Sequence, residues 1–327
     1  MIAIVILNWN GWEDTIACID SVYRSDDNQF SVIVVDNGST NDSVEKICEF
    51  VNSIEGVKVT QVNEGESLKY NIENRDFILY KLDKNYGFAK GNNLGLQLLS
   101  DQPIDYYWIL NNDTEVEPQS LRLLAQFMNY HNDYIACTPQ IRYYYDKNRI
   151  WNCGGKLWWG FRKYYHADQS NIAFNKEFFD ISFITGCALL VRPSALSNNS
   201  LFTERFFFGE EDFELSMRWK LERQKVACLT SSIIYHKVSA STRDHDTLPK
   251  TYIHYLNRFI NVKQHFSIVN YMLWKSVNNV WIALLLFRQK HSIRDIIHFL
   301  SRLNSESKNK DGVDYDYFIR ILKEGIG

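Results

Sequence analysis

Polar side chains follow three hydrophobic segments of the sequence, in each case where the segment ends. They are Asn8 and Asn10 after residues 2–7, Asp36, Asn37 and Ser39 after residues 31–35, and Asn111, Asn112 and Asp113 after residues 106–110. Each group alone is typical of a turn, because Asn, Asp, Ser and Gly are the usual turn residues. Together they favour a ligand site, since ligands of open parallel sheets bind beyond the carboxyl ends of the strands.

A second group of ionisable side chains lies near residue 210. Carboxylates occupy positions 210, 211, 212 and 214, directly after the aromatic run 206–208. An exposed acidic first turn of a helix is the simplest interpretation. Partial burial by the aromatic rings would instead raise a carboxyl pKa toward that of a general base. His236 ends a further predicted strand and is a candidate metal ligand, although a single histidine is more often structural.

The spacing of apolar residues predicts the elements that must hold these side chains. Residues 2–7 and 31–35 are continuous runs rich in β-branched residues and predict buried parallel strands. Helical spacing follows each of them, over residues 14–24 and 43–52. This order predicts an α/β domain with a mostly parallel sheet. Further strands are expected at residues 57–62, 77–82, 106–110, 183–191 and 232–236, and further helices at 121–130, from 212, and at 252–266, 269–287 and 293–303.

Charge and composition exclude several classes of protein. The 327 residues carry a net charge of −3, which argues against a wholly basic nucleic-acid-binding surface. No Gly-x-Gly-x-x-Gly follows the first strand and no P-loop motif occurs, so a dinucleotide or P-loop site is not expected. The six cysteines form no Cys-x-x-Cys pair, and no secretory leader or run of 18 uncharged apolar residues is found. We therefore expect a reduced, cytoplasmic protein without a spanning helix.

Five ordered motifs carry a resemblance to a known family. They are Val-Ile-Leu-Asn-Trp-Asn at 5–10, Val-Val-Asp-Asn-Gly-Ser at 34–39, Asn-Tyr-Gly-Phe-Ala-Lys-Gly-Asn-Asn at 85–93, Leu-Asn-Asn-Asp-Thr at 110–114 and Glu-Asp-Phe-Glu-Leu-Ser-Met-Arg at 211–218. In this order they resemble glycosyltransferase family 2, the inverting transferases of the Rossmann-like GT-A fold, and within it the bacterial rhamnosyltransferase-like group. The resemblance covers residues 2–240. It implies a GT-A domain at 1–245, with a nucleotide-sugar-binding half at 1–115 and an acceptor half at 116–245, followed by a basic helical extension at 246–327.

The resemblance implies a role for each matching polar residue of the first half. Asp36 would accept a hydrogen bond from the uracil or thymine of the donor, with Asn10 and Ser39 beside the nucleoside. Glycine and free helix N–H groups would bring the backbone close to the diphosphate. The full set expected to bind the donor is Asn8, Asn10, Asp36, Asn37, Ser39, Asn85, Gly87, Lys90, Asn92, Asn93, Asn111 and Asn112.

The family's metal and catalytic residues also have counterparts in this chain. Asn111 stands where the family's Asp-x-Asp motif has its first aspartate, so Asp113 is the surer ligand for Mg²⁺ or Mn²⁺, with His236 as the second. Asp212 matches the general base of a single displacement with inversion. The acceptor side would be shaped by Thr185, Gly186, Glu211 and Glu214, of which Glu214 replaces the more usual aspartate.

The expected activity is transfer of a sugar from dTDP-rhamnose or a UDP-sugar to a saccharide or polyprenyl-diphosphate-linked acceptor, in surface polysaccharide synthesis. A sugar-nucleotide nucleotidyltransferase is one alternative, but it would need a Gly-rich, basic loop after the first strand, which residues 8–12 lack. A non-catalytic glycan- or partner-binding protein on the same fold is another. Asn111 supports that alternative, whereas Asp113, Asp212 and His236 weigh against it.

The C-terminal region has the opposite charge from the rest of the chain. Residues 243–310 contain 11 Lys and Arg against four Asp and Glu, interleaved with the apolar runs 269–274 and 280–287. This pattern suits an interfacial helix on anionic lipid, at the inner face of the membrane. It equally suits helices packed on the transferase domain or in a homodimer. The aromatic residues between 143 and 165 are expected mainly in the core, with one or two lining an acceptor groove.

Overall fold

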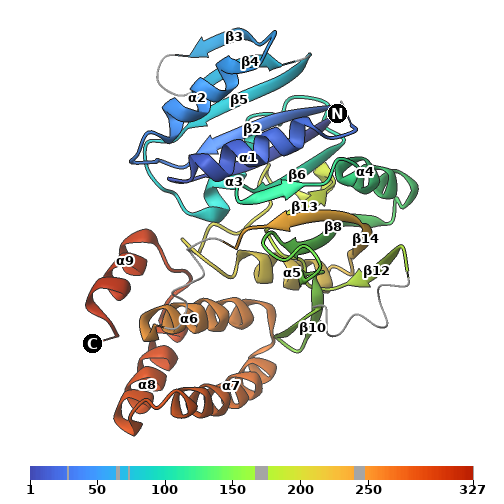
Figure 1. Ribbon diagram of the computed structural model, residues 1–327. Coiled ribbons are helices and arrows are strands. Elements are labelled where there is room, and N and C mark those ends of the chain that lie inside the picture. Colours follow the sequence, from blue (N-terminus) through green and yellow to red (C-terminus); the bar gives the residue numbers. More distant parts are fainter. Residues whose placement is uncertain (28, 64–66, 73, 166–175, 239–246, 327) are drawn as a thin grey trace.

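The computed structural model describes residues 1–27, 29–63, 67–72, 74–165, 176–238 and 247–326. They form an α/β layer built on a twelve-stranded sheet, with a group of helices at one end (Figure 1). The spine of the sheet has the order β12-β14-β8-β13-β6-β1-β2-β5-β4-β3. The four central strands β6, β1, β2 and β5 are parallel, which confirms the expected fold class.

The parallel strands belong to the first half of the chain. Their apolar residues are buried on both faces, as in strands covered by helices on each side. The elements are β1 (Ile2–Asn8), α1 (Trp12–Tyr23), β2 (Phe30–Asp36), α2 (Ser43–Ser53), β3 (Lys58–Asn63), β4 (Ser67–Ile72), β5 (Arg75–Lys81), α3 (Phe88–Gln97), β6 (Tyr106–Asn111) and β7 (Thr114–Val116).

The segment after α2 differs from the expected pair of strands. It contains three antiparallel strands, because residues 67–72 pair with both β3 and β5 as β4. The segment looks polar, yet Tyr70 and Ile72 alternate with polar residues and are buried, which is the pattern of a half-buried strand.

The second half of the chain extends the sheet with mixed strands. β13 lies between β6 and β8 and is antiparallel to both, whereas β14 is parallel to β8. The sequence predicts β13 and the end of β14 but not β8. The elements are α4 (Ser120–Tyr130), β8 (Tyr134–Tyr143), β9 (Ile150–Asn152), β10 (Gly155–Trp158), β11 (Phe161–Tyr164), β12 (Phe178–Ile181), β13 (Ala188–Val191), the short 3₁₀ helix η2 (Pro193–Ala195), α5 (Glu211–Leu221) and β14 (Lys225–His236).

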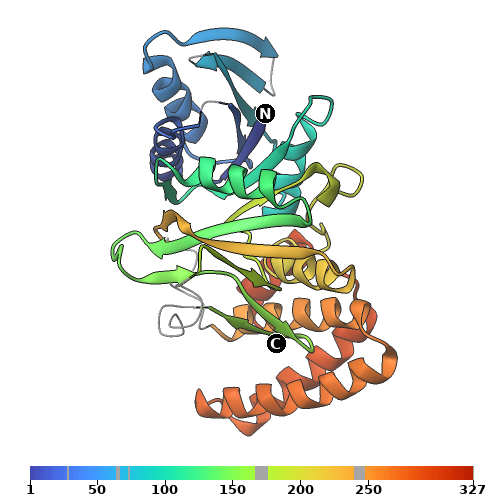
Figure 2. The same cartoon turned by 90° about the vertical axis from the view of Figure 1, so that its right-hand side faces the viewer.

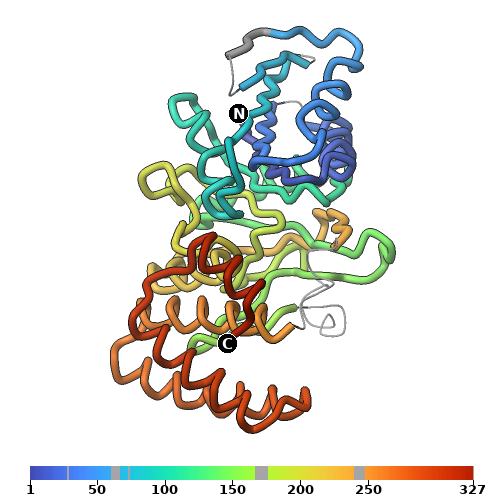
Figure 3. The backbone as a smooth tube through the Cα atoms, turned by 90° about the vertical axis from the view of Figure 1, so that its left-hand side faces the viewer, coloured from blue at the N-terminus to red at the C-terminus, as the bar shows by residue number. Residues whose placement is uncertain are grey.

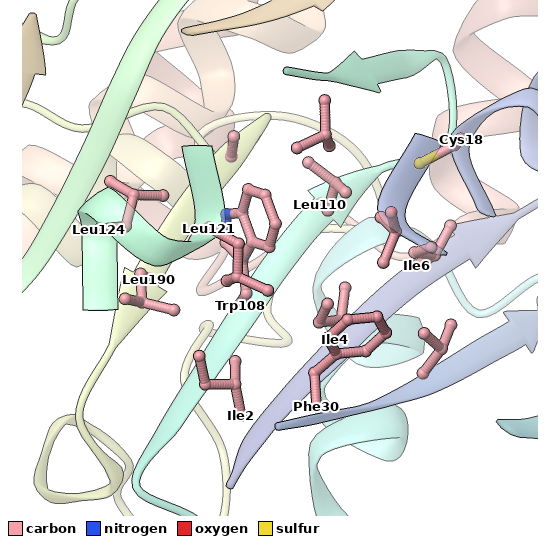
Figure 4. Close-up of a cluster of buried hydrophobic side chains, with 14 of the residues drawn as sticks. Ile2, Ile4, Ile6, Cys18, Phe30, Trp108, Leu110, Leu121, Leu124 and Leu190 are labelled. Atoms are coloured by element: carbon pink, nitrogen blue, oxygen red, sulfur yellow. The ribbon is translucent and has the colours of Figure 1, made fainter. Parts of the chain in front are cut away.

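Two hydrophobic cores lie on opposite faces of the sheet. One is formed with α1, α2 and α4 and contains Ile4, Trp108 and Leu121 (Figure 4). The other is formed with α3 and α5 and contains Val5, Leu96 and Leu215. Alternate residues of β1 therefore enter different cores, as the two-residue period of a strand requires.

The C-terminal helices are α6 (Leu248–His265), α7 (Ile268–Arg288), α8 (Ile293–Asn309) and α9 (Tyr315–Glu324). They share a third core with the second half of the sheet domain, in which Phe213 and Met217 of α5 are buried against Leu256 and Phe259 of α6. Figures 2 and 3 show these helices gathered at the end of the molecule opposite β3. Among the described helices, none combines the length and apolar character needed to cross a membrane.

Candidate active site

The parallel register places the first two polar groups side by side. Asn8 pairs with Asp36 at the ends of β1 and β2, and the Asn8 amide donates to Asp36 Oδ1 over 2.7 Å. The Ser39 hydroxyl donates to the same oxygen over 2.6 Å, and the Ser39 backbone N–H donates to Oδ2 over 3.1 Å. Asp36 is fully buried. The carboxylate is therefore held in a fixed orientation before any ligand binds.

Asn10 joins the loops that follow these two strands. Its backbone has φ of 56°, a left-handed conformation that asparagine tolerates better than most residues. Its side-chain oxygen accepts from the Thr40 N–H over 2.8 Å, and its own N–H donates to Ser39 Oγ over 2.9 Å. The expected nucleoside-binding residues Asn10, Asp36 and Ser39 thus form one connected hydrogen-bonded group.

The loop before α3 is tied to the end of β2. Asn37 donates to Asn85 Oδ1 over 3.0 Å and to the Gly87 carbonyl over 3.2 Å. Gly87 has φ of 84°, and a Cβ at this position would lie 2.1 Å from the Phe207 carbonyl oxygen. Only glycine fits this turn, because the backbone of residue 207 is in contact with it.

Three further residues that are expected to bind the donor lie on α3. The Lys90 ammonium is 4.8 Å from the centre of the Tyr86 ring. Asn92 donates to the Phe88 carbonyl over 2.9 Å. Asn93 is fully buried, donates to Phe202 O over 2.8 Å and accepts from the Phe202 N–H over 3.1 Å, so its amide anchors the loop that follows η2. A donor contact for Asn92 and Asn93 stays a prediction.

A cavity of about 600 Å³ opens beyond the carboxyl ends of β1 and β6. Leu7 and Phe88 line it, so it reaches both the strand that carries Asn8 and the helix that follows Gly87. The structure brings eight of the expected site residues to its wall, namely Asn111, Asn112, Asp113, Thr185, Gly186, Glu211, Asp212 and His236.

Asp113 and His236 form a pair in this wall. Residues 114 and 236 are partners where β7 joins β14, and this pairing sets His236 Nε2 3.0 Å from Asp113 Oδ1. Burial lowers the pKa of His236, but Cys187 and Asp113 together raise it to about 10.

This pair fits a divalent cation that is shared with a substrate. Asp113 would supply an oxygen ligand, and His236 would supply a nitrogen ligand once a bound cation has displaced its proton; Asn111 lines the same cavity. In the part of the chain that the structure describes, no three His, Cys, Asp or Glu residues converge on a metal position. Mg²⁺ commonly takes one or two protein ligands and completes its shell with phosphate oxygens and water.

Glu210 anchors the acidic segment at the start of α5. Its carboxylate is buried, and it accepts two hydrogen bonds from Arg258, one of them over 2.8 Å. His254 Nδ1 lies 3.3 Å and an Arg162 guanidinium nitrogen 3.7 Å from Glu210 Oε1. Burial raises the pKa of Glu210, but the two arginines and His254 outweigh it and lower the pKa to about 2.

The next two carboxyl groups behave in the opposite way. Burial and the adjacent Asp212 raise the pKa of Glu211 to about 8, and Glu211 Oε2 has no hydrogen-bond partner in the described structure. Burial also raises the pKa of Asp212, against the lowering effect of Arg162, whose guanidinium lies 3.8 Å from Asp212 Oδ1. The raised pKa favours the protonated form of Glu211, which would reduce the negative charge beside Asp212.

Glu214 lies apart from this group. Its carboxylate is 3.3 Å from His265 Nε2 on α6 and 3.5 Å from Arg218 Nε. Burial raises its pKa, but these partners lower it below its ordinary value. Because α5 turns by 100° per residue, position 214 faces the helical extension and not the cavity that Asp212 lines.

Sequence reasoning missed several residues of the cavity wall. Arg162 comes from β11 and His254 from α6, about 50 and 40 residues from the carboxylates that they contact. No local motif marks either residue. Trp151 and Tyr164 also line the cavity, in keeping with the expectation of one or two aromatic residues there, and the Trp151 ring centre is 4.4 Å from that of His236.

Comparisons with solved structures show the fold. GalNAc-T7 with UDP, GalNAc and Mn²⁺ aligns with a TM-score of 0.61 and 14% identity, over 100% of this chain and 57% of that one. The mannosyltransferase PcManGT from Pyrobaculum calidifontis, in complex with GDP-Man and Mn²⁺, aligns with a TM-score of 0.55 and 12% identity, over 81% of this chain and 65% of that one. This chain thus spans less than two thirds of either protein. The expected GT-A arrangement is confirmed.

Comparisons of the sequence show the family. No match was found among curated protein sequences. A family model described as glycosyl transferase family 2 matches residues 3–198, and one described as glycosyl transferase family group 2 matches residues 108–321. Each match covers more than half of the sequence and confirms the expectation of a glycosyltransferase at the level of the family. The chain therefore belongs to glycosyl transferase family 2.

Proposed function

We propose that this protein is a metal-dependent, inverting glycosyltransferase that uses a nucleoside diphosphate sugar. The observation that carries the proposal is the convergence of Asp113, His236 and Asp212 on one cavity, at the edge where Asn8 and Asp36 also lie. A metal-binding pair and a carboxylate base on one cavity wall are the groups that such a displacement needs.

The donor would lie along the carboxyl ends of β1 and β2. The group formed by Asn10, Asp36 and Ser39 offers hydrogen-bonding partners to a nucleoside, and the start of α3 offers backbone N–H groups to a diphosphate. A divalent ion held by Asp113 and His236 would stabilise the charge on the leaving diphosphate. The UDP, GDP-Man and Mn²⁺ in the two similar structures support a nucleotide sugar and a divalent metal.

Asp212 would accept the proton of the attacking hydroxyl. Its side chain borders the cavity, and Arg162 at 3.8 Å favours the ionised form that a base requires. Glu211 would stay protonated at neutral pH and could donate a hydrogen bond to the acceptor. Thr185 and Gly186 border the same space and would shape the acceptor side.

We further propose dTDP-rhamnose or a UDP-sugar as the donor. The acceptor would be a saccharide, free or linked to a polyprenyl diphosphate, in surface polysaccharide synthesis. The six cysteines are free thiols, which supports a reducing, cytoplasmic setting. Contact of residues 246–327 with the inner face of a membrane would bring the protein to a lipid-linked acceptor.

A panel of nucleotide sugars tests this proposal. The protein should hydrolyse at least one of them, and the hydrolysis should require Mg²⁺ or Mn²⁺. A nucleotidyltransferase would instead consume a nucleoside triphosphate and a sugar phosphate. A non-catalytic binding protein would hydrolyse none of them at any metal concentration.

Asp212→Asn tests the assignment of the base. Turnover should fall by roughly 10²–10⁴-fold, the usual contribution of a positioned base, while donor affinity is retained. Glu222→Gln is the matched control, because Glu222 is an exposed carboxylate just after α5 and should not affect turnover. Unchanged turnover in Asp212→Asn would exclude this residue as the base.

A further inference from the structure

Helix α7 is apolar on the side that faces away from the protein. Its inward side is buried through Tyr271, Trp274, Asn278, Ile282 and Leu286. We call the opposite side the outer α7 face; its side chains are between 49% and 64% exposed and comprise Val269, Met272, Leu273, Val277, Val280, Trp281, Leu284 and Phe287.

A helix that is hydrophobic all round is normally covered on every side. Here the protein covers only one side of α7, so the outer α7 face has the composition of a buried surface without being buried. Two large residues of α8, Ile293 and Ile297, are also more than 60% exposed and lie directly after the end of this helix in the chain. Figures 1 and 2 show α7 at the border of the molecule, with α6 between it and the sheet.

The charges around this face have one predominant sign. Residues 268–301 contain four Lys and Arg but one acid, Asp295. Arg288, Lys290 and Arg294 are exposed at the turn between α7 and α8, beside the apolar residues. Ser292 caps α8 by accepting from the Asp295 N–H, and its hydroxyl donates to the Asp295 carboxylate over 2.6 Å, so this carboxylate is already engaged. A partner for this surface would therefore supply both apolar groups and negative charge.

We propose that the outer α7 face and the adjoining α7–α8 turn bind an anionic lipid bilayer, with α7 lying in the plane of the interface. The apolar side chains would enter the acyl region, and the three basic side chains would meet the lipid phosphates. A second copy of the chain fits less well, because two such surfaces would both be rich in Lys and Arg, and each copy would have only Asp295 to neutralise them.

The C-terminal end of the same helix lies near the active site. Leu285 of α7 and Gln289, directly after the helix, line a second cavity of about 450 Å³, together with Lys250 of α6. This cavity shares Arg162 and His254, among other residues, with the catalytic cavity. If the proposed transferase function holds, docking through the outer α7 face would place this second cavity beside the lipid headgroups, where the sugar end of a lipid-linked acceptor could enter it.

Vesicle co-sedimentation of the full chain tests the lipid contact without an activity assay. The protein should bind vesicles of phosphatidylcholine mixed with phosphatidylglycerol, and bind pure phosphatidylcholine much less. Leu284→Asn/Phe287→Asn should lower the partition coefficient by about 100-fold, because two large side chains would no longer leave water. The matched control is Tyr130→Asn/Leu221→Asn, which removes two exposed apolar side chains outside α7 and should bind as the wild type does.

The charge contribution is tested with a second pair of variants. Arg288→Gln/Lys290→Gln should weaken binding to the anionic vesicles by about 30-fold, at about 1 kcal/mol for each basic side chain near the membrane surface. Lys58→Gln/Lys81→Gln removes two exposed cations on β3 and β5, outside the C-terminal helices, and should have no effect.

Equal binding by the wild type and Leu284→Asn/Phe287→Asn would overturn the proposal. Concentration-dependent dimerisation that these substitutions abolish, without any vesicle binding, would also overturn it and assign the face to a second copy. If the wild-type protein binds vesicles but transfers no sugar, the lipid contact stands and only the proposed function is contradicted.

Discussion

Glu210→Gln should destabilise the protein by about 3 kcal/mol at neutral pH. Glu210 is buried and its carboxylate accepts two hydrogen bonds from Arg258. Glutamine keeps the size of the side chain and tolerates the same backbone conformation, so the substitution removes mainly the charge. It leaves the buried guanidinium of Arg258 without its counter-ion, and breaking a buried pair from one side typically costs about 3–5 kcal/mol.

A second route through the pKa gives the same magnitude. The folded protein lowers the pKa of Glu210 from 4.5 to about 2. At about 1.36 kcal/mol for each pKa unit, this difference corresponds to roughly 3 kcal/mol of stability. Because the folded pKa is the lower one, the stabilisation is complete above about pH 4.5 and is lost as the pH falls toward about 2. Roughly half of it should remain at about pH 3.

Urea unfolding followed by circular dichroism measures both effects. The free energy of unfolding of Glu210→Gln should lie about 3 kcal/mol below that of the wild type at neutral pH, and the gap should narrow at about pH 3. Glu222→Gln serves as the control and should stay within about 0.5 kcal/mol of the wild type, because Glu222 is exposed.

A double variant separates the ion pair from other effects of the substitution. Arg258→Met added to Glu210→Gln removes the unpaired cation and should recover part of the lost stability. A loss below about 1 kcal/mol in Glu210→Gln at neutral pH, or a gap that does not change with pH, would refute the reasoning.

Three further predictions concern the cavity and its loops. Gly87→Ala should raise the KM for the donor, and its Cβ would meet residue 207. The substitution should therefore lower stability by more than the roughly 1–3 kcal/mol that its backbone conformation alone would cost. Gly56→Ala is the control in urea unfolding, because Gly56 has φ of 76° and open space around its Cβ. Arg162→Gln should move the acid limb of the pH profile of kcat/KM to higher pH, since Arg162 lowers the pKa of Asp212; an unmoved limb would contradict this. His236→Ala should raise the Mn²⁺ concentration needed for half-maximal hydrolysis, and unaltered metal dependence would exclude His236 as a ligand.

The central part of the fold follows from local sequence patterns. β1, β2 and β6 are buried on both faces, and such strands appear in a sequence as continuous apolar runs that need no partner to be identified. β8 and β4 were missed for a different reason. β8 contains Pro139 and Gln140, and β4 is short and half polar, so each depends on pairing with neighbours that are distant or not evident in the sequence.

The candidate site likewise contains residues that the sequence predicts and residues that it does not. Asn8, Asp36 and Asp113 lie at strand ends, and the parallel register alone is enough to bring such ends together. Arg162, His254 and Arg258 come from β11 and α6, and their position depends on how the helical extension packs. The sequence therefore predicts which residues form the acidic segment, but not that the pKa of Glu210 is lowered while those of Glu211 and Asp212 are raised.

The lowered pKa of Glu210 arises largely from the extension at 246–327, which also borders the cavity through His254. Arg258 and His254 of α6 neutralise Glu210, while Phe213 and Met217 of α5 are buried against the same helix. A chain cut near residue 245 would remove Arg258 and His254 from Glu210, leave only Arg162 at 3.7 Å, and expose the apolar side of α5. Loss of activity or of lipid binding in such a truncation would therefore report a disrupted active site and core. Substitutions on the outer α7 face change a surface that the fold does not use, so they separate the contribution of lipid contact from that of folding.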